Sequence, residues 1–108
     1  MVQKLLLNWD DPSVQRSSPP KFPSGEVVAT PAALAAMEAH QCTPFALLAR
    51  HLAGDWGSVP VEDAQLNDQA LQSGGRLLSS YTIAPGTRIW LITEWDRSVS
   101  TFLLPSEY

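Results

Sequence analysis

Two adjacent glycines, Gly74 and Gly75, separate two hydrophobic patterns in this chain. Before them, apolar residues recur at the three- and four-residue spacing of amphipathic helices. After them, apolar residues alternate with polar ones or form short continuous runs, as they do in strands. The chain is therefore predicted to be helical first and extended afterwards, which gives an α+β fold.

Three helices are expected before the glycines. The first runs from Pro31 to about His40, and the second begins at Pro44 and ends near Gly54. Each follows a threonine whose hydroxyl can cap the helix, and proline suits the first helical position because it lacks the N–H that would stay unpaired. Gly54 is placed to end the second helix in the left-handed conformation.

The third helix is predicted from Pro60 to Gln72. At 100° per residue, Asn67 falls on the apolar face that also carries Ala64. The stretch from His51 to Asn67 is therefore interpreted as a structural joint between two helices, in which the amide of Asn67 satisfies backbone groups of the turn. The residues assigned to this turn are Gly54, Asp55, Trp56 and Asn67.

A three-stranded antiparallel meander is expected at the C-terminal end, from the segments "RLLSSYTI", "TRIWLITEW" and "VSTFLLP". The three helices are expected to pack on it, with a short strand or arm at the N-terminus. The middle strand carries Ile89, Leu91 and Trp95 on one face and Trp90 and Ile92 on the other. A sheet that is apolar on both faces is covered on both, and the helices cover only one.

The length of 108 residues and a hydrophobic content of 44% suit one small domain, placed at residues 25–108. Residues 1–24 form a Pro/Ser-rich arm with a small apolar patch near its start. This patch and the second face of the sheet are the predicted partner-binding surface, and its residues are Trp90, Ile92, Trp95, Leu6 and Trp9.

The formal charge of −4 and the lack of a Lys/Arg cluster argue against nucleic-acid binding, which depends on cationic side chains. No apolar run reaches the length of a signal peptide or a membrane span. One cysteine, Cys42, excludes an internal disulfide and fits a reducing compartment. A cytoplasmic location is therefore expected, without membrane contact.

Four residues form the best catalytic candidate set: Arg76, Tyr81, Glu94 and Arg97. Pairing of the first two strands brings Arg76 near Glu94, and an arginine near a carboxylate and a tyrosine can stabilise charge on a phosphodiester. The alternative is a salt bridge at the strand ends and a tyrosine in the core. We favour this alternative.

Metal binding is not expected. The soft ligands are His40, Cys42 and His51, which is fewer than a structural zinc site needs, and their spacing matches no zinc motif. No cofactor is expected either.

The phrases "GDWG", "EDAQLN", "GGRLLSSY", "ITEWDRS" and "LLPSEY", in this order, resemble a family of small uncharacterised bacterial proteins associated with plasmids and other mobile elements. The resemblance covers roughly Gly25 to Tyr108 and implies no established activity. Trp95 stands where the family pattern has alanine, which adds an aromatic ring beside the loop. The resemblance implies that these residues belong to the family pattern: Asp55, Trp56, Asn67, Arg76, Tyr81, Glu94 and Arg97.

The preferred hypothesis is a small binding or regulatory protein of a mobile element that acts through a protein partner, with a homodimer as one form. The alternatives are a small toxin-like ribonuclease or phosphodiesterase and an inhibitor of a host defence enzyme. An enzyme is the less favoured of these classes, because no chemical constellation stands out and the negative charge disfavours RNA.

Overall fold

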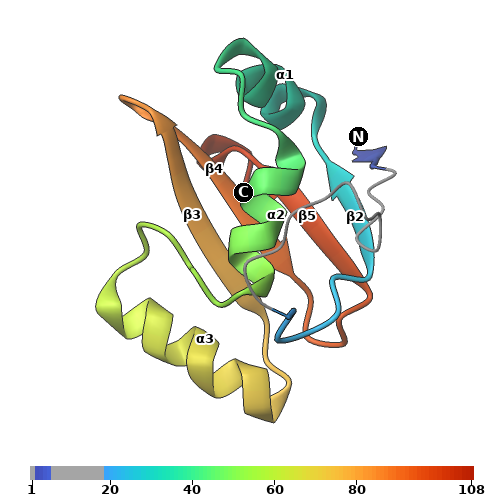
Figure 1. The fold of residues 1–108 in the computed structure, drawn as a ribbon, viewed down its shortest axis with the longest axis vertical. Coiled ribbons are helices and arrows are strands. Elements are labelled where there is room, and N and C mark those ends of the chain that lie inside the picture. The colour runs from blue at the N-terminus through green and yellow to red at the C-terminus, as the bar shows by residue number, and fades with distance from the viewer. Residues whose placement is uncertain (1, 6–18) are drawn as a thin grey trace.

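A mixed β-sheet forms the centre of the molecule (Figure 1). The computed structural model describes residues 2–5 and 19–108, and the elements below refer to these residues. The strands are β1 (Gln3–Lys4), β2 (Glu26–Ala29), β3 (Leu77–Ala84), β4 (Thr87–Thr93) and β5 (Val99–Leu103). The helices are α1 (Pro31–Ala39), α2 (Pro44–Leu52), α3 (Val61–Ser73) and the short 3₁₀ helix η1 (Pro105–Glu107).

The sheet has five strands within the described residues, in the order β1-β2-β5-β4-β3. The antiparallel hairpins β3–β4 and β4–β5 are present, but the prediction of a three-stranded meander is wrong for the sheet as a whole. Strand β2 pairs in parallel with β5, and β1 pairs antiparallel with β2. The physical reason is that β5 would otherwise present a row of unpaired backbone groups at a sheet edge.

Helices α1 and α2 begin where the Thr-Pro pairs predict. Thr30 Oγ1 accepts a hydrogen bond from the backbone N–H of Ala33 at 3.1 Å, and Thr43 Oγ1 accepts one from Ala46 at 3.2 Å. The residue after the C-cap of α2 is Gly54, in the left-handed region with φ of 84°. The capping chemistry visible in the sequence thus fixes both ends of α2.

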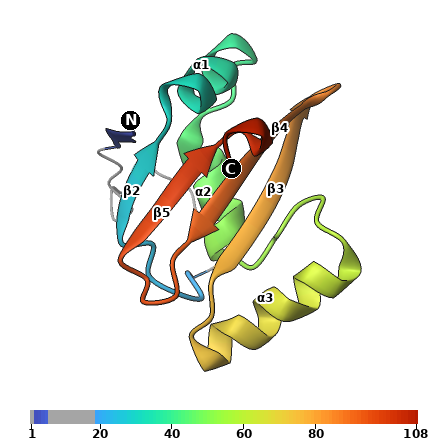
Figure 2. The ribbon, with the colours of Figure 1, turned by 180° about the vertical axis from the view of Figure 1, so that it is seen from behind.

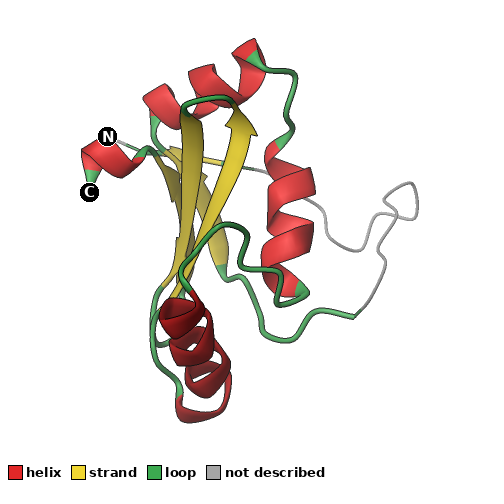
Figure 3. Cartoon of the chain, turned by 90° about the vertical axis from the view of Figure 1, so that its left-hand side faces the viewer, coloured by secondary structure: helices red, strands yellow, loops and turns green. Residues whose placement is uncertain are grey.

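The expectation that all three helices pack on the sheet is not met, because the helices lie at three different places around it. Figure 3 shows α2 lying along one face, α1 across one end of the strands and α3 beyond the other end. Only Asn67 and Ala70 of α3 are buried, because most of its side chains are polar. A helix with so narrow an apolar stripe lies at the margin of a core and does not cover a sheet face.

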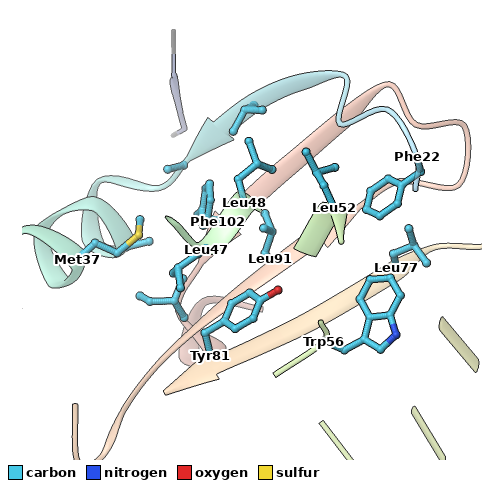
Figure 4. Packing of buried hydrophobic residues seen from close by; sticks show 14 of the residues in the cluster. Phe22, Met37, Leu47, Leu48, Leu52, Trp56, Leu77, Tyr81, Leu91 and Phe102 are labelled. Carbon is cyan, nitrogen blue, oxygen red and sulfur yellow. The ribbon is translucent and has the colours of Figure 1, made fainter. Parts of the chain in front are cut away.

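The core lies between α2 and the sheet (Figure 4). Leu47, Leu48 and Leu52 of α2 face strand residues that include Leu91 and Phe102. Phe22, which falls within the arm expected over residues 1–24, is also buried in this core, with 7% of its surface exposed. The part of the arm next to β2 is therefore built into the fold.

Candidate functional site

The strand register defines which side chains lie on the face of the sheet opposite α2. Directly paired residues project to the same face, and side chains alternate along each strand. One row of paired residues crosses this face from β1 to β3: Lys4, Val28, Thr101, Ile92 and Leu78. The adjacent row, from β5 to β3, contains Leu103, Trp90 and Ser80. We call the surface formed by these two rows and their flanking charged residues the second face.

Figure 2 looks onto the second face, with α2 behind the sheet. Among the described elements, η1 and the residue after it are what lie on this side of the strands (Figures 2 and 3). Ile92 is buried, whereas Leu78, Trp90 and Thr101 keep partial exposure. The second face is therefore apolar at its centre and open to solvent over part of its area.

A pocket of about 220 Å³ lies on the β3–β4 half of the second face, lined by Arg76, Leu78, Trp90, Ile92 and Tyr108. The Arg76 guanidinium donates from Nη1 to the Tyr108 hydroxyl at 2.7 Å and lies 5.4 Å from the centre of its ring. The Tyr108 ring meets Trp90 edge to face, with 5.5 Å between ring centroids. Tyrosine, tryptophan and arginine are the residue types that contribute most to protein interfaces.

Two loose ion pairs lie at opposite edges of the second face. Arg76 Nε and Glu94 Oε2 are 3.7 Å apart at the β3–β4 edge, which confirms that these residues are neighbours. Lys4 Nζ and Glu26 Oε1 are 3.8 Å apart at the β1–β2 edge. All four side chains are more than a third exposed, so neither pair contributes much to folding and all four charges stay available to a partner.

The catalytic candidate set is not brought together. Tyr81 points into the core on the other face of the sheet, where its hydroxyl donates to the Asp55 carbonyl at 2.6 Å and burial raises its pKa. Arg97 donates to the backbone carbonyls of Gly75 and Ala70 at 2.6 and 2.9 Å and thereby holds the C-terminal end of α3. Arg97 also donates to the backbone carbonyl of Glu94 at 3.1 Å, so it lies next to Glu94 with its guanidinium engaged by main-chain acceptors. Tyr81 is engaged on the other face of the sheet, away from Arg76 and Glu94.

The predicted partner-binding residues divide into three groups. Trp90 and Ile92 lie on the second face. Trp95 lies in the turn after β4, because that strand ends at Thr93, and it is 68% exposed instead of facing the core beside Leu91. Leu6 and Trp9 lie outside the described residues.

The joint between α2 and α3 is fastened to the outer edge of β3. Asn67 is 4% exposed and pairs with both backbone groups of Leu78: its Nδ2 donates to the carbonyl at 2.8 Å, and its Oδ1 accepts from the N–H at 3.1 Å. Asn67 faces inward as expected, but its partner is the strand and not the turn. The side chain therefore takes the place of a neighbouring strand.

The turn itself is held by its own residues. Asp55 accepts from Arg50 Nε at 2.7 Å and from the N–H of Gly57, and this hydrogen bond to the guanidinium lowers the pKa of Asp55. The indole of Trp56 is buried and donates to Asp68 at 3.0 Å. The backbone of Trp56 and Ser58 pairs with Ser80 of β3, so the loop and Asn67 together cover that sheet edge.

A buried polar chain, which sequence reasoning missed, runs under α2. His51 is fully buried; its Nδ1 lies 2.6 Å from Ser79 Oγ and its Nε2 lies 2.9 Å from Thr93 Oγ1. Thr93 Oγ1 lies 2.7 Å from Ser100 Oγ, which donates to the carbonyl of Ser24 at 2.7 Å. In the sequence, this polar chain is indicated only by Ser79, Thr93 and Ser100, which occupy inward positions of β3, β4 and β5.

The last acceptor of this chain fixes the direction of each hydrogen bond back to Nε2 of His51. A carbonyl only accepts, so Ser100 donates to Ser24 and must accept from Thr93. Thr93 in turn accepts from Nε2–H of His51. Burial, with a smaller contribution from the charge of Arg97, lowers the pKa of His51 to about 3, so the imidazole is neutral and its Nδ1 accepts from Ser79.

A second, larger hollow lies at the junction of α1 and α2. It measures about 550 Å³ and is lined by side chains that include Met37, Gln41 and Cys42. Burial raises the pKa of the Cys42 thiol, so this cysteine is not activated as a nucleophile. Among the described residues, no three His, Cys, Asp or Glu side chains are grouped so that they could hold a metal ion.

Comparison of the chain with models of protein families, with curated proteins and with solved structures finds no match. Within residues 2–5 and 19–108, none of the helices has the length and apolar composition needed to cross a bilayer.

Proposed function

We propose that this chain is a small binding protein of a bacterial mobile element that acts by contacting a protein partner with the second face of its sheet. The observation that carries the proposal is the group of Trp90, Tyr108 and Arg76 around an apolar pocket on a sheet face that α2 leaves open. The mobile-element setting is supported by the resemblance of the phrases "EDAQLN" and "GGRLLSSY" to that family of bacterial proteins.

The composition of the second face favours a protein over a small substrate. The pocket is small beside the 300–1,000 Å³ of typical ligand sites, and it continues into a mixed apolar and charged surface. An apolar centre with aromatic side chains inside a charged rim is the usual anatomy of a protein interface. A binding or regulatory role therefore fits the second face better than catalysis.

Affinity capture with a truncated second face tests this proposal. Trp90→Ala removes the ring that packs on Tyr108, and we expect loss of the protein captured by the wild-type chain. Leu66→Ala is the matched control, because Leu66 is an exposed apolar residue of α3 outside the second face. Equal capture by Trp90→Ala and wild type, with both chains folded, would exclude the second face as the binding surface.

A further inference from the structure

We propose that the partner of the second face is a second copy of this chain, packed sheet to sheet. The two copies are related by a two-fold axis that lies between the two sheets, parallel to the strands and in front of the gap between β4 and β5. The inference rests on the proposed function and names its partner. Its basis is the order of the strands and the positions of the charges along them.

The strand order makes the second face self-complementary under this rotation. The axis exchanges β4 with β5 and β3 with β2, because those strands lie at equal distances on its two sides. Within the rows already described, Ile92 then faces Thr101 of the other copy and Leu78 faces Val28. In the next row Trp90 faces Leu103. Packed sheets keep their strands nearly aligned, so equivalent rows lie opposite each other, with η1 and Tyr108 of each copy between the sheets.

The same rotation brings opposite charges together. The row before these continues from Arg76 through Glu94 and Val99 to Glu26, as the Arg76–Glu94 ion pair and the hydrogen bond from Glu94 N–H to the Val99 carbonyl show. Arg76 lies at the β3 end of that row and Glu26 at the β2 end. The axis therefore places Arg76 of each copy opposite Glu26 of the other.

The two halves of the second face also differ in the size of their side chains. Tyr108, 68% exposed, lies over the β3–β4 half, where it contacts Arg76 and Trp90. The β5–β2 half carries the smaller side chains of Val28, Val99 and Thr101. The rotation sets the Tyr108 side of one copy against the β5–β2 side of the other.

Charge also favours this surface for self-association. On the second face, with η1 included, three basic side chains accompany three acidic ones: Lys4, Arg76 and Arg88 with Glu26, Glu94 and Glu107. This surface thus has a formal charge of 0, and the rest of the chain carries the net charge of −4. Two copies repel each other less when they meet through the second face than through other surfaces.

Variants that reverse the charges of Arg76 and Glu26 test the arrangement, with the dimer dissociation constant measured by sedimentation equilibrium. Wild type is expected to dimerise, and Arg76→Glu and Glu26→Arg are each expected to weaken the dimer about tenfold or more, because like charges then face each other. The double variant R76E/E26R is expected to recover the wild-type dissociation constant. It still lacks both ion pairs within the chain, so recovery reports contact between copies.

Glu38→Arg is the matched control, since it reverses an exposed charge on α1 away from the second face, and it should leave the dimer unchanged. Circular dichroism confirms that each variant is folded. A wild-type chain that stays monomeric, or a double variant no tighter than the single ones, overturns the two-fold arrangement. A monomer whose captured partner is still lost in Trp90→Ala would overturn this inference while leaving the proposed function intact.

Discussion

At the scale of single residues, the two serines of "LLSSY" show how one strand gives equivalent side chains different roles. Ser79 faces the core and donates to His51, whereas Ser80 faces the opposite side and its buried hydroxyl has no hydrogen-bond partner among the described residues. A buried hydroxyl without a partner costs free energy, and one with a partner stabilises modestly. The alternation of the strand alone separates the two cases.

We predict opposite effects for the two serine-to-alanine substitutions. Ser79→Ala leaves Nδ1 of the buried His51 without its donor and should lower the free energy of unfolding by about 1–3 kcal/mol. Ser80→Ala removes an unsatisfied polar atom and should leave that free energy unchanged or raise it by up to about 1 kcal/mol. Urea unfolding measures both, and equal destabilisation by the two variants would contradict these assignments.

The neutral state of His51 predicts that stability falls with acid. Its pKa is about 3 in the folded chain and near 6.5 when unfolded, so the unfolded chain binds the extra proton between these values. This contribution to stability is complete above pH 6.5 and is lost as the pH falls toward 3. Between pH 7 and pH 5 the free energy of unfolding should decrease by about 2 kcal/mol.

His51→Gln is the informative variant, because an amide can keep one donor and one acceptor in the buried chain without titrating. The variant should show a smaller decrease in the free energy of unfolding between pH 7 and pH 5. This range lies above the pH at which carboxylates take up protons. His40→Gln is the control at an exposed histidine and should keep the wild-type slope. An unchanged slope in His51→Gln would show that another group carries the pH dependence.

At the scale of elements, local chemistry was readable from the sequence and long-range pairing was not. The threonine caps and Gly54 defined α2 because caps and left-handed turns depend on neighbouring residues. The parallel pairing of β2 with β5 joins segments about seventy residues apart, and no local pattern specifies it. The prediction that Asn67 contacts the turn is wrong for the same reason. Its partner is Leu78 of β3, and this contact is set by where α3 packs.

Asn67 is predicted to be the main attachment of α3 to the sheet. Asn67→Leu leaves the N–H and carbonyl of Leu78 without their partner, so the free energy of unfolding should decrease by about 2–4 kcal/mol. Gln69→Leu makes a comparable change at an exposed position of the same helix and should have little effect. Thermal and urea unfolding compare the two, and similar stability in both variants would show that Asn67 does not hold α3 in place.

At the scale of the whole molecule, the two faces of the sheet have different tasks. The face under α2 contains the core and the buried polar chain of His51. The second face carries Trp90, Tyr108 and Arg76, with ion pairs at its two edges. The sequence predicted that the middle strand is apolar on both sides. The favoured assignment of Tyr81 to the core is confirmed. The position of Trp95 was predicted wrongly, because it depends on where β4 ends.

Amide NMR spectra recorded as the protein concentration is raised test most directly the central claim that two copies of the chain bind through the second face. Signals of Leu78, Ile92 and Thr101 should shift together with the Trp90 indole, because these residues lie at the proposed contact. Signals of α2, such as Leu48, should stay constant on the opposite face. Shifts confined to α1, α2 or α3, or spectra that do not change with concentration, would contradict the assignment of the second face as a surface where two copies bind.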